Sequence, residues 1–287
     1  MNAPALPEVV SGKFILGMPE EEYHSHPALS ASGMKNLLRS PKHFRAARSL
    51  NKAKAEFDIG HAVHARVLGI GAPMVEIPAS KLSADGGIRS NDAKAWVDAA
   101  RAEGQVPLKP LVFAAVKRGS EAVLANPKAR ALLETPGYTE VSLFAEDEQT
   151  GVKLRGRIDR LADSLIDLKT TTDVRPQKLR AAVTDFHYDL SAAVYRELVR
   201  LVIGEDPGPM HLIFVEKEAP HEVRVVRLSH PDWVEGGSRK MRAAIDLYAR
   251  CVEFGHWPGA DDDEGPITEL EPPAWYLPAV DRLETDL

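Results

Sequence analysis

Residues 152–170, VKLRGRIDRLADSLIDLKT, predict two short strands joined by a tight turn. In the first strand apolar residues alternate with charged ones, as the period-two repeat of a strand requires. The second strand spans residues 165–170 and places Asp167 and Lys169 on one face, opposite its apolar residues. Residues 162–164, Ala-Asp-Ser, form the turn. The fold is therefore expected to be built around a β-hairpin with charged residues on one face.

The length of the turn determines how the two strands pair. A three-residue loop pairs Leu161 with Leu165 and puts Asp159 directly opposite Asp167 on the same face. Opposed residues on antiparallel strands have Cβ atoms roughly 4.5–5.5 Å apart, where two like charges are destabilising. A two-residue loop would shift this register by one, so the direct opposition depends on the loop.

A divalent cation would neutralise two opposed carboxylates. Mg²⁺ and Mn²⁺ prefer carboxylate oxygens, and Lys169, two residues beyond Asp167, points into the same space. The pattern Asp-x-Lys also occurs on solvated strand faces. The hairpin alone therefore leaves both a metal site and an ordinary polar surface open.

The composition is that of a globular protein with a large enough core for one large domain or two small ones. The chain has 287 residues, of which 44% are hydrophobic and 27% charged. We expect neither a signal peptide nor a membrane span, and hence a cytoplasmic location, because no stretch approaches 18 apolar residues. Cys251 is the only cysteine, which excludes an internal disulfide and a cysteine-ligated zinc or iron–sulfur site.

The charge distribution is uneven. The formal net charge is −6, yet residues 35–54 contain basic residues and no acidic one. These basic residues are Lys35, Arg39, Lys42, Arg45, Arg48, Lys52 and Lys54. The run is either a solvated helix face or a surface that follows phosphates.

The remaining chain predicts alternating helices and strands after an irregular lead-in of about 20 residues. Ser30 or Ser32 caps a first helix, which ends at Ser40 because Pro41 follows. Further helices are expected near residues 42–49, 60–69, 92–103, 113–124, 185–203 and 233–253, and further strands near residues 75–78, 138–146, 210–216 and 222–228. The tail from residue 257 is rich in proline and acidic residues.

The helix expected at residues 60–69 carries a histidine near its apolar stripe. Val63, Val67 and Leu68 form the stripe, and His64 lies one turn from Leu68. Gly60, one turn before His64, permits close approach of backbone or ligand. His64 is either a core histidine with its hydrogen bonds satisfied or a ligand of the hairpin site.

These stretches together resemble a known nuclease family. The order of elements and the stretches themselves are similar to the RecB-like branch of the PD-(D/E)XK superfamily, and within it to the phage and prophage RecE (exonuclease VIII) type. The similarity covers most of residues 20–276. The stretches that carry it are YHSHPALSASGMKNLLRSPKHF (23–44), GHAVHARVLG (60–69), LRGRIDRLADSLIDLKTTTD (154–173), YDLSAAVY (188–195), IFVEKEAPHEVRVV (213–226) and HWPG (256–259).

The resemblance implies an α/β (α+β) fold. Its core is expected to be like that of restriction endonucleases, with a central mixed sheet flanked by helices. We expect residues 1–56 to form an N-terminal helical extension packed on this core, residues 57–276 the nuclease domain, and residues 277–287 a tail.

The resemblance also implies phosphodiester hydrolysis with one or two Mg²⁺ ions, which Mn²⁺ can replace. The expected enzyme is a 5′-to-3′ exonuclease acting processively on linear double-stranded DNA ends. It would leave 3′ single-stranded overhangs for phage-type recombination, work with a RecT-type single-strand annealing protein and assemble into a homo-oligomeric ring. The alternatives are a related endonuclease or single-strand nuclease, or a non-catalytic DNA-binding module on the same fold.

The site residues that the resemblance implies centre on the hairpin. His64, Asp159 and Asp167 would ligate Mg²⁺, with the backbone carbonyl of Leu168 as a further ligand. Lys169 would orient or activate the attacking water, a role that suits an ammonium beside phosphate oxygens. In addition, Glu140 is either near the metal or a surface carboxylate.

The helix after the hairpin departs from the family pattern. The family commonly has Gln-x-x-x-Tyr there, and this chain has Ser191 and Tyr195. Tyr195 matches, but serine is too short to reach as far as glutamine, which puts the positioning of DNA by this helix in doubt. The basic residues that would contact phosphates, with surface charge as an equal alternative, are Arg155, Arg157, Arg175, Lys178 and Arg180.

Overall fold

A mixed sheet forms the centre of the protein in the computed structural model, which describes residues 4, 6–50, 59–259, 261–262, 267 and 269–285. Its main order is β1-β5-β6-β7-β8-β9, and β2 pairs beside it with β6. β7 and β8 are parallel, as are β2 and β6, whereas the other neighbours are antiparallel. The strands are β1 (Lys13–Ile15), β2 (Leu29–Ser30), β5 (Tyr138–Glu146), β6 (Lys153–Leu161), β7 (Leu165–Thr171), β8 (His211–Glu216) and β9 (Val223–Arg227).

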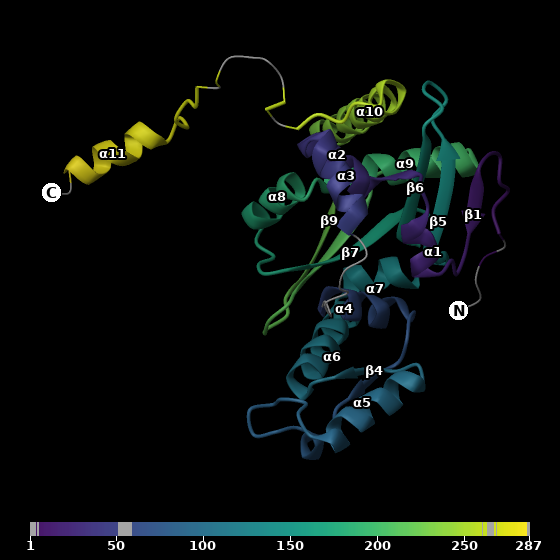
Figure 1. Cartoon of the computed structure of the whole chain (residues 1–287), viewed down its shortest axis with the longest axis vertical. Coiled ribbons are helices and arrows are strands. Elements are labelled where there is room, and N and C mark those ends of the chain that lie inside the picture. Colours follow the sequence, from purple (N-terminus) through teal and green to yellow (C-terminus); the bar gives the residue numbers. More distant parts are fainter. Residues whose placement is uncertain are drawn as a thin grey trace.

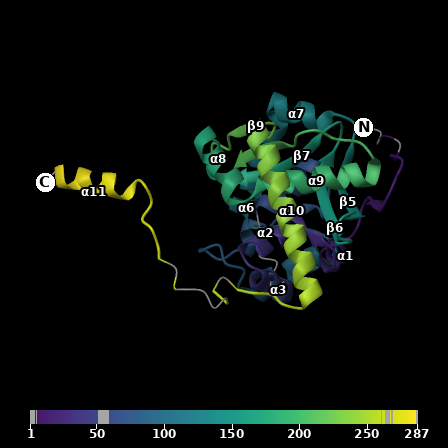
Figure 2. The same cartoon turned by 90° about the horizontal axis from the view of Figure 1, so that it is seen from above.

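Helices cover the sheet on both faces, which confirms the predicted fold class (Figures 1 and 2). One face packs on α2 (Ala31–Arg39), α9 (Tyr188–Ile203) and α10 (Pro231–Phe254), and the other on α4 (Ile59–Leu68) and α6 (Pro110–Ala125). The other helices are α1 (Glu20–Ser25), α3 (Pro41–Leu50), α5 (Asn91–Ala102), α7 (Pro127–Glu134), α8 (Pro176–Asp185), α11 (Tyr276–Thr285) and the short 3₁₀ turn Ala79–Lys81.

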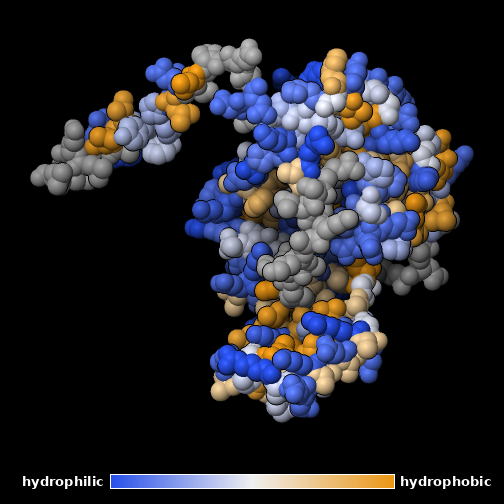
Figure 3. All heavy atoms as spheres, in the orientation of Figure 1, coloured by the Kyte–Doolittle hydropathy of each residue, from blue (hydrophilic) through white to orange (hydrophobic). Residues whose placement is uncertain are grey.

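A small lobe extends from the second face. A pair of parallel strands, β3 (Met74–Glu76) and β4 (Val106–Leu108), lies there with α5 and α6. Figure 3 shows hydrophilic residues over most of the upper body, while hydrophobic residues reach the surface of this lobe. No helix in the described part of the chain is both long and apolar enough to cross a membrane.

The hairpin that decides the fold opens into a fork. Leu161 pairs with Leu165, as the three-residue loop predicts, and Arg160 pairs with Ile166. The ladder between β6 and β7 ends there, so Asp159 and Asp167 do not form a paired position in it. Further along, β6 pairs instead with β2, and β7 with β8. The space between the diverging strands holds the charged residues of the hairpin.

Gly156 lets α9 lie close against the fork. A Cβ at this position would lie 2.6 Å from Cδ1 of Leu198 and 3.0 Å from Cδ1 of Tyr195, both on α9. Such distances are shorter than carbon atoms tolerate without a shift of the neighbour. Gly156 therefore allows the close approach of α9 to β6.

The N-terminal region contains α1, α2 and α3, and it also contributes two strands to the sheet, β1 at its edge and β2 beside β6. β1 lies within the lead-in that was expected to be irregular, and α1 begins at its end. The division into an extension and a nuclease domain stays a prediction. The predicted boundary at residues 56 and 57 lies outside the described residues, as do Lys52 and Lys54 of the basic run. Strands of two or three residues carry too little alternation to be recognised in a sequence.

Other elements follow the expectation with shifted ends. Ser30 caps α2, because its hydroxyl accepts a hydrogen bond from the Gly33 N–H at 3.1 Å. The helix expected at residues 185–203 is α9, which begins at Tyr188 because His187 before it adopts a left-handed conformation at φ 50°. The strand β4 and the helices α7, α8 and α11 were not predicted.

Candidate metal centre

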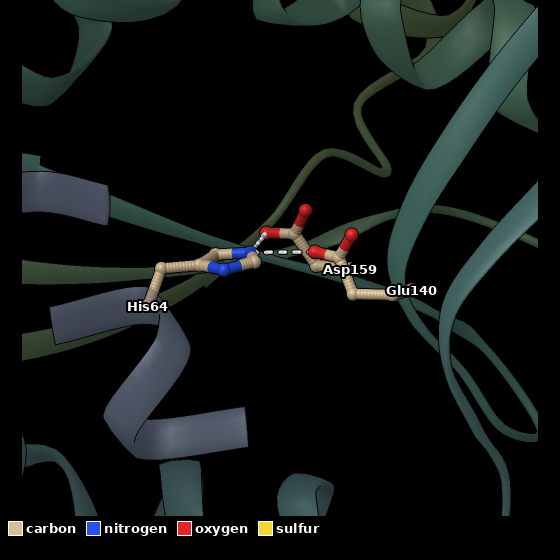
Figure 4. Close-up of side chains that lie close together, drawn as sticks. All are labelled: His64, Glu140 and Asp159. Carbon is tan, nitrogen blue, oxygen red and sulfur yellow. Dashed lines mark ion pairs between the residues drawn. The ribbon is translucent and has the colours of Figure 1, made fainter. Parts of the chain in front are cut away.

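Three side chains from separate elements converge beside the fork. His64 comes from α4, Glu140 from β5 and Asp159 from β6, and one ligand atom of each lies within 4.8 Å of the others (Figure 4). Nε2 of His64 is 2.9 Å from Oδ2 of Asp159 and 3.7 Å from Oε1 of Glu140. An imidazole and two carboxylates at this separation make a donor set for a divalent cation.

Asp159 also bridges the two diverging strands. Its Oδ2 accepts a hydrogen bond of 2.9 Å from the backbone N–H of Leu168 on β7. This contact replaces the strand pairing that ends two residues earlier. It brings Leu168, the predicted backbone ligand, next to the His64–Asp159 pair, although the Leu168 N–H and not its carbonyl makes the contact.

Asp167 and Lys169 form an ion pair beside this cluster. Nζ of Lys169 is 2.6 Å from Oδ2 of Asp167 and donates a longer hydrogen bond, 3.4 Å, to the Leu168 carbonyl. Asp167 is 4% exposed, so its charge is balanced mainly by this lysine. Among the described residues, the third member of the cluster with His64 and Asp159 is therefore Glu140. Asp167, which was predicted as a ligand, is instead paired with Lys169.

The two carboxylates of the hairpin have pKa values shifted in opposite directions. Burial acts to raise the pKa of Asp159, but the charges of His64 and Lys169 and the Leu168 N–H lower it below the ordinary value. Burial raises the pKa of Asp167, and Asp159 adds to this effect against the opposing charge of Lys169. A carboxylate pair with divergent environments is typical of functional sites.

The two cationic groups of the centre are stabilised in their charged forms. Burial acts to lower the pKa of His64, but the Asp159 carboxylate and then Glu140 raise it overall. Burial also acts to lower the pKa of Lys169, and Asp167 and Asp159 outweigh it, so the pKa lies above its usual value. Lys169 is therefore protonated at neutral pH.

Glu140 occupies an irregular point of β5. Its backbone φ is 52°, in the left-handed region that residues other than glycine seldom adopt. Burial raises the pKa of its carboxyl group, with His64 opposing. The structure assigns Glu140 to the cluster rather than to the surface, and backbone strain of this kind tends to occur at functional sites.

The residues predicted on α9 lie behind the fork. Tyr195 packs against Gly156, and burial, followed by the charge of Asp167, raises the pKa of its hydroxyl well above the ordinary value. Ser191 is buried and its hydroxyl donates a 3.4 Å hydrogen bond to the His187 carbonyl. Its side chain is thus directed at its own helix.

Arg155 and Arg157 are used inside the protein, contrary to their predicted role as phosphate contacts. Arg155 is 9% exposed and donates to the Ala28 carbonyl at 3.1 Å and to the His24 carbonyl at 3.4 Å. The side chain of Arg157 is 14% exposed and donates to the Met18 carbonyl at 2.7 Å. Guanidinium groups bound to backbone carbonyls are not free to follow a DNA backbone.

The other predicted contacts are on the surface of α8 and just before it. Lys178 and Arg180 are exposed on α8. Arg175 is exposed and forms an ion pair with Asp173, which occupies its guanidinium. Their role towards phosphates stays a prediction.

Sequence reasoning missed two neighbours of Lys169. Nζ of Lys169 lies 5.6 Å, and Nζ of Lys35 5.5 Å, from the centre of the Tyr188 ring. Burial, and then the charge of Lys169, lower the pKa of Lys35 to about 8. The acid-free basic run around Lys35 was the available signal. Of that run, Arg39, Lys42 and Arg45 are exposed.

The His64–Asp159 pair makes stability depend on pH in the metal-free protein. The pKa of His64 is higher in the folded than in the unfolded protein. The pair therefore contributes its full stability below the unfolded pKa of about 6.5, and this contribution is lost as the pH rises through the folded pKa. The pKa of Asp159 is lowered below its ordinary value of 3.8 by the His64 charge, so the contribution of this carboxylate to stability is lost only as the pH falls through that lowered pKa. Near pH 6 we expect the free energy of unfolding of the wild type to be about 1.5 kcal/mol higher than that of His64→Gln.

Urea unfolding in EDTA between pH 4 and 9 measures this difference. The advantage of wild type is expected to be constant up to about pH 6.5 and to shrink above it. A difference that stays the same at every pH would contradict an ionic His64–Asp159 pair and make His64 a packing residue.

Comparisons with known proteins identify the family and the fold of the chain. Residues 30–263 match the family model described as a PDDEXK-like domain of unknown function (DUF3799). A provisionally assigned exonuclease from Eubacterium rectale superposes with a TM-score of 0.58 at 13% identity, covering 92% of this chain and 99% of its own. At that identity the likeness shows the fold alone.

A second solved structure, an alkaline exonuclease from Laribacter hongkongensis, is more distant. It is 17% identical, covers 68% of this chain and 95% of its own, and has a TM-score of 0.27. Among curated proteins none matches the sequence.

Proposed function

Because the chain belongs to the family of PDDEXK-like domains, we propose that it is a divalent-metal-dependent deoxyribonuclease. The observation that carries this proposal is the convergence of His64, Glu140 and Asp159 within 4.8 Å of one another, beside the Asp167–Lys169 pair. A purely structural polar cluster does not require an imidazole, two carboxylates and an adjacent ammonium at one fork. Phosphodiester hydrolysis uses each of them.

The residues fit a hard cation such as Mg²⁺ or Mn²⁺. Carboxylate oxygens of Asp159 and Glu140 and Nε2 of His64 would hold it, and Asp167 and the Leu168 carbonyl lie next to them. A bound ion would polarise the scissile phosphate and lower the pKa of its water. It would also neutralise carboxylates that the fold holds close together.

Lys169 supplies a positive charge for the reaction. Its raised pKa keeps the ammonium protonated, so the side chain cannot accept a proton from water at neutral pH. Held by Asp167 at 2.6 Å, it can orient the attacking water and stabilise charge that develops on phosphate oxygens. Of the two roles considered for Lys169, orientation is therefore favoured over deprotonation of the water.

The finer function that we propose rests on the resemblance to RecE-type enzymes. The protein would act in the cytoplasm as a Mg²⁺-dependent exonuclease on double-stranded DNA ends, degrading the 5′-ended strand. The 3′ overhangs would serve recombination with a RecT-type annealing protein. A homo-oligomeric ring would suit repeated cleavage of one strand.

Digestion of end-labelled linear DNA and of circular DNA tests the proposal. We expect linear duplex to be degraded with Mg²⁺ or Mn²⁺, EDTA to stop the reaction, and circular duplex and circular single strands to stay intact. Label at the 5′ end should be released before label at the 3′ end. Cleavage of circles would indicate an endonuclease or single-strand nuclease, and binding without hydrolysis by the folded protein a non-catalytic module.

A further inference from the structure

Tyr23 of α1 lies between two arginines of β6. Its ring centre is 4.6 Å from the Arg155 guanidinium carbon and 4.3 Å from that of Arg157, and the residue is 8% exposed. An aromatic face attracts a cation strongly where water is excluded. This contact holds the N-terminal segment, residues 18–28, against the strand that carries Asp159.

Arg157 connects this N-terminal segment to the metal centre. Its Nη2 donates to the Met18 carbonyl at 2.7 Å and its Nε to Oγ of Ser142 at 3.1 Å. Its Nη1 lies 3.6 Å from Oε2 of Glu140. The guanidinium thus has fixed partners on two sides and one carboxylate of the centre on the third.

The carboxylate of Glu140 is divided between Arg157 and His64. Oε2 faces Arg157, while Oε1 faces Nε2 of His64 at 3.7 Å. Glu140, with φ 52°, has no paired neighbour on β6 to restrain it, because the register between β5 and β6 passes from Thr139–Arg160 to Val141–Ile158. Arg157 is therefore what keeps Oε1 turned towards the centre.

We propose that Arg157 is a positioning residue that holds Glu140 ready to bind the metal, and that Tyr23 holds Arg157 in turn. The N-terminal segment then completes the metal centre, although Tyr23 precedes the residues 30–263 that match the family model. The inference deepens the proposed metal-dependent function and rests on its metal site. Groups that orient metal ligands typically change affinity by 10- to 100-fold when they are removed.

Calorimetric titration with Mn²⁺ alone, without DNA, tests this chain of contacts. We expect Tyr23→Leu and Arg157→Met each to weaken Mn²⁺ binding by about 10- to 100-fold. Tyr23→Phe keeps the ring face over the guanidinium and should stay within about threefold of wild type. Tyr23→Leu leaves every proposed ligand in place, so it remains informative if Arg157→Met does not fold.

Phe44→Leu is the matched control for lost aromatic packing. Phe44 is 5% exposed and stacks on Trp257 with ring centres 5.6 Å apart. Its replacement therefore removes buried aromatic packing without touching the contacts between Tyr23 and the two arginines. Unchanged Mn²⁺ affinity in this variant supports the proposal. Equal weakening in Phe44→Leu, or wild-type affinity in folded Tyr23→Leu, would overturn it. The two proposals can fail separately. If the wild type binds Mn²⁺ but does not cleave DNA, and Tyr23→Leu binds Mn²⁺ more weakly than the wild type, the inference is supported and only the nuclease proposal is refuted.

Discussion

Replacing Lys169 by methionine is expected to lower the rate of DNA hydrolysis by about 100- to 1000-fold. Methionine keeps much of the length of the lysine side chain but removes the ammonium that lies 2.6 Å from Asp167. The substitution therefore deletes the positive charge available to the phosphate oxygens. Single-turnover hydrolysis of linear duplex measures the loss, and Mn²⁺ titration shows that the ligands remain. Lys94→Met, at an exposed lysine on α5 to which no role in binding is assigned, is the control and should stay close to wild type.

The same substitution is expected to destabilise the fold, and a second change separates this effect from catalysis. Asp167 is 4% exposed and would be left without its cation, at a cost of about 2–3 kcal/mol, since Lys169 is partly exposed. Adding Asp167→Asn removes the isolated charge and should restore most of that stability. Because Asp167 is itself a predicted ligand, the double variant should remain inactive, and its regained stability shows how much of the effect of Lys169→Met on the protein is a folding effect. If hydrolysis returned together with stability, the role of Lys169 would be structural.

The hairpin was predictable because its signals are local. Loop length determines the Leu161–Leu165 register, and the alternation of apolar and charged residues shows which face carries Asp167 and Lys169. What the sequence could not show is that the ladder ends after Arg160. That depends on β2, a two-residue strand from far along the chain, taking the place beside β6.

The ligand cluster was only partly predictable for a similar reason. Glu140 alternates with apolar neighbours like any surface residue of a strand, and only its left-handed backbone turns it towards His64. Arg155 and Arg157 also read as surface charges, because alternation assigns a residue to a face but does not show what covers that face. The N-terminal segment covers it, and its carbonyls take up both guanidinium groups.

The departure from the family pattern at Ser191 changes which side chains lie next to the metal centre. The hydroxyl of Ser191 turns back to the His187 carbonyl, so this position of α9 offers no side chain towards the fork. Lys35 and Tyr188 lie beside Lys169 instead. Positive charge next to the centre therefore comes from α2, which no pattern in the helix after the hairpin could reveal.

Asp159→Asn is expected to abolish divalent-metal binding and hydrolysis while leaving the metal-free fold intact. Oδ2 of Asp159 accepts the Leu168 N–H and faces Nε2 of His64, both at 2.9 Å, and the oxygen of an asparagine can keep the first contact. The charge is lost, and with it the main anionic ligand, so Mn²⁺ affinity should fall by more than about 100-fold, beyond the loss typical of an orienting group.

The electrostatics of the metal-free protein make this prediction distinctive. Asp159 raises the pKa of Asp167, so its neutralisation should lower that pKa and relieve repulsion inside the fork. The melting temperature in EDTA should accordingly change little, because this relief offsets the loss of the ionic contact with His64. Calorimetry with Mn²⁺ and thermal unfolding in EDTA measure the two effects. Asp163→Asn, at the exposed hairpin turn, is the matched control and should alter neither. Wild-type Mn²⁺ affinity in folded Asp159→Asn would show that Asp159 is not a ligand.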